Sequence, residues 1–246
     1  ERIRESVAEG WVYQVNACRR LTHSDDGQSL RGLFSEILKK NPAPWASYFE
    51  VPGVMIASAS PELFLSRNGS TVKSSPIKGT QATNSQQFGA KDQAENVMIV
   101  DLMRNDLGQI CKSGTVEVPR LLSSEEHPGL QHLVSDVQGE LLEGISWKQI
   151  FTALSPPGSV SGAPKSSATQ VIAENEIVRG PYCGALGWIQ GDQAVLSVAI
   201  RTFWKDTKIN FGTGAGITWG SDARAEWEET QLKAKRLISI AGGELQ

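Results

Sequence analysis

Apolar residues recur along the chain with two different spacings, which separate the expected helices from the expected strands. In 30–40 the apolar side chains stand three or four positions apart, the spacing of one face of a helix. Glycine after a periodic stretch, or proline and aspartate at its start, indicates where such helices end or begin. The expected helices are 1–10, Leu30–Lys40, Asp92–Leu107, Trp147–Leu154, Pro164–Glu174 and Asp222–Ala241.

Other stretches alternate or are continuously apolar and rich in β-branched or aromatic residues, which predicts strands. Asn68-Gly69 lies between two of them and is a strong signal for a hairpin turn, and Gly191-Asp192 separates another pair. We expect loops at 155–162 and 214–220. Because strands come in hairpin-like pairs, the pattern predicts an α+β fold with mostly antiparallel sheets. The expected strands are Trp11–Cys18, Trp45–Phe49, Val54–Ala59, Leu63–Ser66, Thr71–Ser74, Thr115–Leu121, Gln131–Glu140, Cys183–Gln190, Ala194–Thr202 and Lys208–Thr213.

Composition narrows the class of protein. The 246 residues carry 24 Lys+Arg against 27 Asp+Glu, a formal net charge of -3, so we expect no binding to nucleic acid. No apolar run approaches the ~18 residues of a membrane span and no secretory leader opens the chain, so we expect no membrane association. The cysteines are three and lie far apart in sequence, at Cys18, Cys111 and Cys183, which argues against a disulfide framework or a zinc site. We therefore expect the protein in the reducing cytoplasm. We expect one domain over 1–246.

Two expected helices each carry a pair of carboxylates three positions apart. Asp92 and Glu95 lie on the apolar face of one, and Glu226 and Glu229 align with Lys233 on the other. Acidic residues also favour helix N-termini, and a Glu–Lys pair four apart is common on surfaces, so spacing alone favours these ordinary roles. If the two pairs met, their oxygens would suit Mg²⁺.

Three further side chains are candidates for chemistry. Lys78 precedes a glycine; such a lysine is usually a surface residue, but an enclosed one becomes a nucleophile. Glu62 stands at the entrance of a strand, where exposure is the ordinary expectation and an apolar pocket would suit it to general acid work. Arg201 ends an apolar run and could clamp a carboxylate. The glycines of 212–216 could present backbone N–H groups to an anion, although a tight turn is the simpler interpretation.

Ten stretches, in order along nearly the whole chain, resemble the chorismate-utilising enzymes. This family includes anthranilate synthase component I, aminodeoxychorismate synthase component I, isochorismate synthases and salicylate synthases. The matching stretches are Tyr13–Asn16, Ser60–Glu62, Pro76–Thr80, Glu95–Gly108, His132–Val134, Pro157–Lys165, Tyr182–Gly184, Ala199–Thr202, Gly214–Ile217, and Glu226–Thr230 with Lys233.

The resemblance implies a substrate, a metal and roles for individual residues. It implies antiparallel sheets in a sandwich with helices outside, and Mg²⁺ on the ring carboxylate of chorismate. The implied metal ligands are Glu95 and Glu229, with Asp92 and Glu226 near the waters of the metal. Glu62 would protonate the departing C4 hydroxyl. The implied substrate-binding residues are Thr80, His132, Tyr182, Arg201, Gly214, Gly216 and Lys233.

Two positions bear on which reaction is catalysed. Lys78 replaces the alanine that looks typical of anthranilate synthases. In this it resembles aminodeoxychorismate synthase, where the resemblance implies that the lysine attacks C2. Gln14 stands where water-adding members carry a base lysine, which disfavours isochorismate and salicylate synthases. Gln81 and Gln109 replace arginines common in the family but leave the implied catalytic set intact.

The resemblance therefore predicts amination of chorismate to 4-amino-4-deoxychorismate, on the route to 4-aminobenzoate and folate. A glutamine amidotransferase, separate or fused, would supply ammonia. The chain, which begins at Glu1, would be a catalytic domain cut from a longer chain whose N-terminal half is missing. The alternatives are an anthranilate synthase component I, and an inactive subunit that binds chorismate or docks a partner.

Overall fold

A computed structural model describes residues 1–24, 27, 29–82, 88–127 and 130–245, which form two compact units interleaved along the chain. The first unit comprises Glu1–Pro61, Val160–Gly184 and Ala199–Gln246, and the second comprises Glu62–Ser159 and Ala185–Val198. A single domain over the whole chain stays a prediction.

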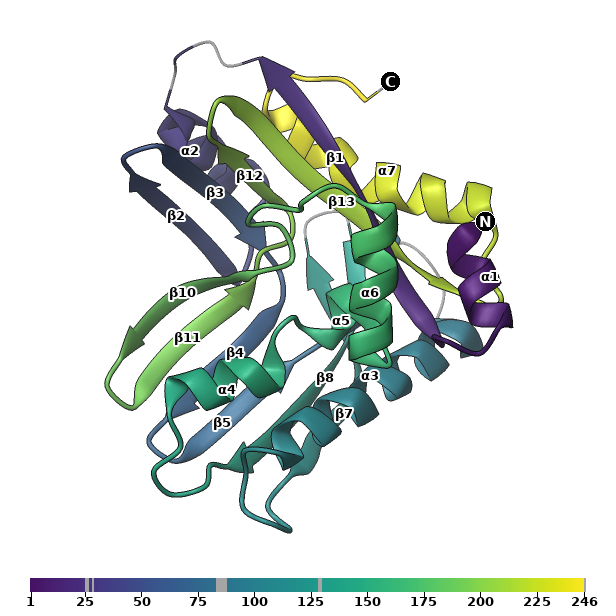
Figure 1. Ribbon diagram of the computed structural model, residues 1–246. Coiled ribbons are helices and arrows are strands. Elements are labelled where there is room, and N and C mark those ends of the chain that lie inside the picture. The colour runs from purple at the N-terminus through teal and green to yellow at the C-terminus, as the bar shows by residue number, and fades with distance from the viewer. Residues whose placement is uncertain (25–26, 28, 83–87, 128–129, 246) are drawn as a thin grey trace. The chain divides into compact units, whose positions relative to one another are not determined.

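The first unit is built on a sheet with the strand order β2-β3-β12-β13-β1-β9 (Figure 1). Every neighbouring pair is antiparallel, and β1 pairs with β13 along its whole length. Helices α2 and α7 pack against this sheet and against each other, while α6 packs on β1 and β9. The elements are α1 (Arg2–Ala8), β1 (Gln14–Ser24), α2 (Leu30–Lys40), β2 (Trp45–Val51), β3 (Val54–Ser60), β9 (Gly162–Ala163), α6 (Lys165–Asn175), β12 (Thr202–Lys205), β13 (Lys208–Thr218) and α7 (Ala223–Ile240).

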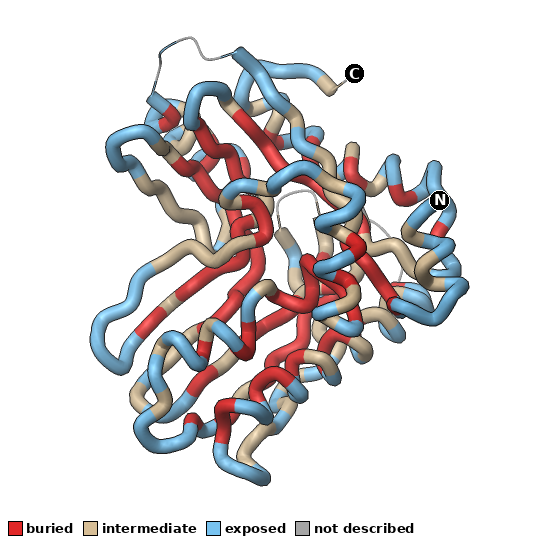
Figure 2. Tube along the Cα trace, viewed as in Figure 1, coloured by how far each residue is buried: buried red, intermediate tan, exposed pale blue. Residues whose placement is uncertain are grey.

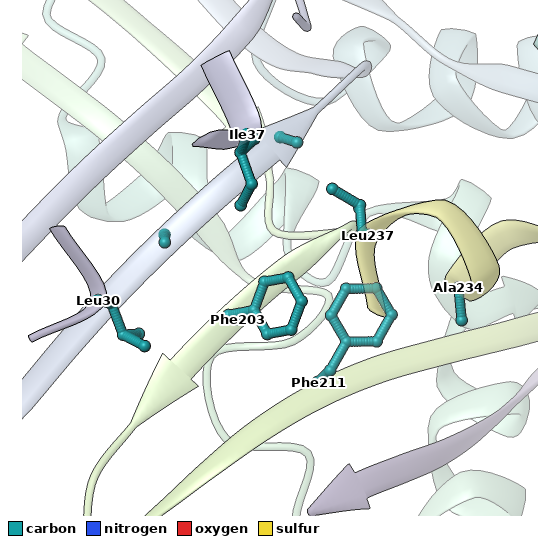
Figure 3. Packing of buried hydrophobic residues seen from close by; sticks show 8 residues of the cluster. Leu30, Ile37, Phe203, Phe211, Ala234 and Leu237 are labelled. Carbon is teal, nitrogen blue, oxygen red and sulfur yellow. The ribbon is translucent and has the colours of Figure 1, made fainter. Parts of the chain in front are cut away.

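Aromatic and aliphatic side chains from five elements, α2, β3, β12, β13 and α7, form a core cluster of the first unit (Figure 3). The rings of Phe203 on β12 and Phe211 on β13 lie 4.7 Å apart between centroids. Ile37 of α2 and Leu237 of α7 are buried in the same cluster, as the helical spacing of their apolar positions requires. This cluster fixes α7, and with it the carboxylates that the helix carries, against β13.

The second unit has a sheet ordered β10-β11-β4-β5-β8-β6, with β7 also paired to β8. The strands are antiparallel, β8 is buried over six consecutive residues, 132–137, and α3 packs on β8 (Figure 2). The elements are β4 (Leu63–Asn68), β5 (Thr71–Ser75), β6 (Ile77–Ala82), α3 (Ala90–Gly108), β7 (Glu117–His127), β8 (Leu130–Glu140), α4 (Trp147–Leu154), α5 (Gly158–Ser161), β10 (Ala185–Gln190) and β11 (Gln193–Val198).

The structure confirms the α+β class, the antiparallel sheets and the hairpin at Asn68-Gly69. Helices 30–40 and 147–154 have the predicted bounds. The stacking of the sheets into a sandwich stays a prediction. None of the described helices combines the length and apolar character needed to span a bilayer.

The expected loop at 214–220 was wrong in its first half, because β13 continues to Thr218. Gly214 pairs with Cys18 and Gly216 with Asn16 across the ladder. The expected loop at 155–162 was also wrong in part, since it contains the short helix α5 and the start of β9. In both places glycine was taken as a breaker, whereas the structure uses it for close packing.

Candidate functional site

In the second unit, Lys78 lies at an irregularity in β6. Ile77 pairs with Val134 and Thr80 with His132, so two residues of β6 oppose one residue of β8. This extra residue is a β-bulge, a device that re-aims a side chain. Gly79 has a φ of +81°, and Lys78 is buried, with 9% of its surface exposed. The ordinary alternative of a surface lysine is therefore wrong, while the catalytic role that the resemblance implies for Lys78 stays a prediction.

The residue pair that follows the bulge brings a hydroxyl to an imidazole. Thr80 Oγ1 lies 3.1 Å from His132 Nδ1, and His132 is buried. The His127 ring packs beside that of His132, with centroids 5.0 Å apart. The contact to Thr80 restricts the rotation of the His132 ring.

Glu62 is buried rather than exposed, and the hydroxyl of Ser159 donates a 2.5 Å hydrogen bond to its Oε1. Ser159 belongs to α5, which lies close to α3. A Cβ at Gly158 would come 2.3 Å from Leu102 Cδ2, so only glycine allows this approach. Ser159 was missed in the sequence, although it stands inside the glycine-rich stretch that resembles the family.

Helix α3 carries the two carboxylates of the second unit in different environments. Asp92 Oδ2 accepts the backbone N–H of Gly89 at 3.2 Å, so Asp92 satisfies the N-cap backbone at the helix N-terminus. Glu95, one turn later, is half-buried, and the ammonium of Lys91 lies 3.8 Å from its Oε1. Asp92 thus has the ordinary role of an acidic residue at a helix N-terminus. Glu95 does not share this role and contacts Lys91 instead.

A buried polar network fixes α3 on β8. Asn96 donates from Nδ2 to the carbonyl of Leu133 at 3.0 Å, and Ser135 Oγ donates to Asn96 Oδ1 at 2.6 Å. Both side chains are buried, so the network is costly to break. Because Glu95 precedes Asn96 and His132 precedes Leu133, this network sets the positions of both candidate residues. Its only trace in the sequence is a polar residue on an apolar helix face.

In the first unit, the Tyr182 ring lies over the glycines of β13. A Cβ at Gly212 would come 2.3 Å from Tyr182 Cγ, and one at Gly214 would come 3.2 Å from Tyr182 Oη and from Asn16 Nδ2. The glycines therefore make room for the tyrosine on a regular strand. Tyr182 is buried, and burial holds the pKa of its phenol well above the usual value.

Arg201 lies between β11 and β12 with a φ of +53°, a left-handed conformation that is uncommon for a residue other than glycine. Its carbonyl accepts the N–H of Ala59 at 3.0 Å. Burial lowers the pKa of its guanidinium to about 10. A desolvated guanidinium of this kind gains from contact with an anion, which fits a carboxylate-binding role.

The carboxylates of α7 are also held differently. Glu226 is buried and accepts a 2.6 Å hydrogen bond from Ser221 Oγ. Glu229 Oε1 pairs with Lys233 Nζ at 2.5 Å, and the same ammonium donates to the carbonyl of Gly214 at 3.1 Å. Lys233 therefore links Glu229 to the glycines of β13. Ser221 Oγ also reaches the carbonyl of Gly216 at 3.5 Å.

The predicted site residues thus fall into two sets, one in each unit. Within the described ranges, no group of three or more His, Cys, Asp or Glu side chains forms a metal site. Shared binding of a metal by Glu95 and Glu229 stays a prediction. The second unit holds Glu62, Lys78, Thr80, Asp92, Glu95 and His132, and the first holds Tyr182, Arg201, Gly214, Gly216, Glu226, Glu229 and Lys233.

The chain is similar in sequence to known component 1 proteins of two kinds. It is 35% identical to anthranilate synthase component 1 of Saccharolobus solfataricus over 97% of this chain and 60% of that protein. It is 34% identical to aminodeoxychorismate synthase component 1 of Bacillus subtilis over 95% of this chain and 53% of that protein. The chain therefore spans between half and two thirds of the length of these relatives.

Solved structures agree with this relationship. Anthranilate synthase component I from Streptococcus pneumoniae aligns with a TM-score of 0.86 and 31% identity, over 96% of this chain and 55% of that chain. A menaquinone-specific isochorismate synthase from Escherichia coli shares the fold, with a TM-score of 0.85 at 22% identity, over 98% of this chain and 59% of that chain. Residues 1–239 match the family of chorismate binding enzymes, and the chain belongs to that family.

Proposed function

We propose that this chain aminates chorismate at C4 and so forms 4-amino-4-deoxychorismate. The observation that carries the proposal is Lys78, a buried amine on a β-bulge, at the position where anthranilate-forming relatives resemble one another in having alanine. An amine attacks through its nitrogen lone pair, so a lysine held against the substrate can act as a nucleophile. A bulge gives such a side chain a fixed direction.

The proposed reaction has two displacements. Lys78 Nζ forms a bond to C2 of chorismate while the ring double bonds shift and the C4–O bond breaks. The amine loses a proton, and the hydroxyl takes one and leaves as water. Ammonia then forms a bond to C4, the double bonds return, and the C2–N bond breaks to release Lys78. The sum is chorismate plus ammonia giving the amine and water.

Glu62 is the proposed acid for the departing hydroxyl. Its carboxyl group is buried, and Ser159 fixes its orientation through the 2.5 Å hydrogen bond. A positioned acid of this kind contributes about 10²- to 10⁴-fold to a rate. Once it has given up that proton, the Glu62 carboxylate can accept one from the ammonia nitrogen as this nitrogen bonds to C4, while Lys78 regains the proton it lost when the C2–N bond breaks.

The two substrate carboxylates need positive partners. Arg201, with its desolvated guanidinium, and the hydroxyl of Tyr182 are proposed for them, together with backbone N–H groups at Gly214 and Gly216. Lys233, which already touches the carbonyl of Gly214, adds a further positive charge. Thr80 and His132 are proposed to line the pocket.

We also propose Mg²⁺ as cofactor. The donor chemistry fits, since Glu95 and Glu229 offer carboxylate oxygens and each now contacts a lysine ammonium that a metal ion could replace. Asp92 and Glu226 are engaged by Gly89 and Ser221 and are proposed to contact the waters of the metal. When bound, the ion would neutralise the ring carboxylate of chorismate.

The proposed ammonia source is a glutamine amidotransferase. Component I relatives such as that of Bacillus subtilis carry names that imply a second component. Gln14, buried in β1, stands in place of the base lysine of water-adding members, and ammonia needs no such base because it has its own lone pair.

A second candidate function is that of an anthranilate synthase component I. Relatives of that name match about as well, since the one from Saccharolobus solfataricus is 35% identical and the aminodeoxychorismate synthase 34%. The reactions differ in their product: anthranilate formation places the amine at C2 and releases pyruvate. Lys78 is the position that opposes this candidate.

The product formed from chorismate, Mg²⁺ and ammonium, with the amidotransferase and glutamine in a parallel sample, tests the proposal. We expect 4-amino-4-deoxychorismate, at least a hundredfold loss with Lys78→Ala, and little change with the control Lys112→Ala, whose side chain is about half exposed. Anthranilate and pyruvate as main products would establish the second candidate instead. Calorimetric binding of chorismate without turnover in either sample would indicate an inactive subunit.

A further inference from the structure

The segment 176–184 follows α6 in the first unit and carries Tyr182. It contains an ion pair between Arg179 and Glu176, and each of these side chains also hydrogen bonds to the backbone of β1. Arg179 contacts both oxygens of Glu176, with Nε 2.7 Å from Oε2 and Nη2 2.9 Å from Oε1. The two side chains are 14% and 11% exposed. We call this arrangement the 176–179 clamp. Although burial alone would lower the pKa of Arg179, the hydrogen bond to Glu176 raises it above its usual value, so the guanidinium stays charged.

The clamp takes the place of a neighbouring strand at the edge of β1. Strand β9 pairs with β1 only at Gln14 and Val15. Beyond that point, Cys18 donates its backbone N–H to Glu176 Oε1 at 2.8 Å, and the carbonyl of Asn16 accepts from Arg179 Nη2 at 2.7 Å. Arg179 Nη1 also donates to the carbonyl of Val160 at 3.0 Å. One guanidinium therefore joins three separate stretches of chain.

The other end of the segment is held by backbone bonds. Cys183 donates to the carbonyl of Ala199 at 2.9 Å, and Ala199 donates to that of Gly184 at 2.8 Å. Cys183 has a φ of +68°, a conformation that costs energy for a residue with a side chain. Tyr182 lies between these bonds and the clamp, so both ends of its short segment are fixed.

Packing alone does not hold the clamp side of the segment. A cavity of about 230 Å³ lies there, lined among others by Cys18, Arg179, Tyr182 and Trp204. Ile177 and Val178, within the segment, are exposed. With an open space behind it and solvent beside it, the segment depends on the directed bonds of Arg179 for its position.

We propose that Arg179 is a positioning residue for Tyr182: through its contacts with Glu176 and β1 it holds the phenol over Gly214. This inference rests on the proposed function, in which Tyr182 contacts a carboxylate of chorismate. A lysine at 179 could keep the charge but not the fork of donors, because an ammonium cannot contact Glu176 with two nitrogens while reaching two carbonyls. The tyrosine would then lose its fixed place.

The first test is a double-mutant cycle on chorismate consumption, measured without regard to the product. We expect Arg179→Lys to lower kcat/KM about 10- to 100-fold, mainly through KM, since a small displacement of a binding group is costly. In the Tyr182→Phe background the same change should cost less than about threefold, because the group that it positions is already removed. Arg31→Lys is the matched control, an exposed arginine paired with Glu50 at 2.9 Å.

The second test needs no chorismate. Cys183 is buried, and burial raises the pKa of its thiol, so it should react slowly with a disulfide reagent. We expect Arg179→Lys to accelerate labelling of Cys183 at least tenfold, with the site identified by mass spectrometry. The buried Cys111 of the second unit is the internal reference, whose rate should not change if the fold is otherwise intact.

The outcomes separate the inference from the function on which it rests. If the wild-type protein does not consume chorismate, the proposed function is refuted. The labelling rates of Cys183 would still decide whether the clamp holds the segment. Equal cost of Arg179→Lys with and without Tyr182 would refute positioning, as would unchanged labelling of Cys183. Arg179→Gln serves as a second variant if the lysine variant fails to fold.

Discussion

Gly79→Ala is the substitution for which the structure allows the clearest estimate of stability. Gly79 follows Lys78 in the β6 bulge and has a φ of +81°. A Cβ placed there would come 3.1 Å from Asp92 Cβ and 3.1 Å from Phe88 Cδ1. The substitution therefore adds two costs. One is the left-handed conformation of a residue with a side chain, and the other is a close contact with Asp92 of α3 and with Phe88.

The left-handed conformation costs about 1–2 kcal/mol for an alanine. Overpacking in a tight environment costs about 1–3 kcal/mol more. Reduced freedom of the unfolded chain returns about 0.4–1 kcal/mol. We therefore expect Gly79→Ala to lower the free energy of unfolding by about 2–4 kcal/mol.

Gly114→Ala is the matched control, because Gly114 lies in the same unit with a φ of +80° and no described atom lies within 4 Å of its added Cβ. It should lose only about 1 kcal/mol, the cost of the conformation less the gain in the unfolded state. Urea unfolding followed by tryptophan fluorescence measures both variants. Equal losses in the two would refute the reasoning, since the contact with Asp92 and Phe88 would then contribute nothing.

Three further predictions concern other parts of the molecule. Ser159→Ala removes the hydrogen bond to buried Glu62, so chorismate turnover should fall about tenfold while the melting temperature changes little, and full activity would contradict the role of this pair. Phe211→Ala should cost about 3–5 kcal/mol in urea unfolding, because Phe211 is buried against Phe203; a loss below about 1 kcal/mol would contradict this core. Burial raises the pKa of Cys18 from 9.0 to about 12, so the folded state retains a proton there that the unfolded chain releases. The free energy of unfolding should therefore fall as the pH rises above the usual thiol pKa of 9.0. Between about pH 8.5 and 11, the urea midpoint of the wild type should fall more than that of Cys18→Ser.

Local sequence predicted most of the elements because their signals are short-range. The apolar spacing of Leu30–Lys40 produces the α2 face that packs into the core, and Asn68-Gly69 produces its hairpin. Glycines were the main source of error. Gly214 and Gly216 look like a loop in sequence, yet both lie in β13, and what Gly214 accommodates is Tyr182, a residue more than 30 positions away.

The candidate residues could be named from sequence, but their environments could not. Spacing favoured a surface role for Lys78 and Glu62, and both are buried. Asp92 does have the capping role that spacing favoured. The contacts of Ser159 and Arg179 could not be read from sequence, because their partners, Glu62 in one case and the edge of β1 in the other, are brought near only by the fold.

The sequence by itself determined the α+β class, the bounds of the strongly periodic helices and, through its ordered motifs, membership of the chorismate binding enzymes. Tertiary structure decided which polar side chains are buried, which glycines sit in strands, and how Arg179 fastens the segment of Tyr182. The physical reason is that periodicity and turn propensity act between neighbours in the chain. Desolvation, close packing and side-chain hydrogen bonds instead depend on residues distant in sequence that only folding brings together.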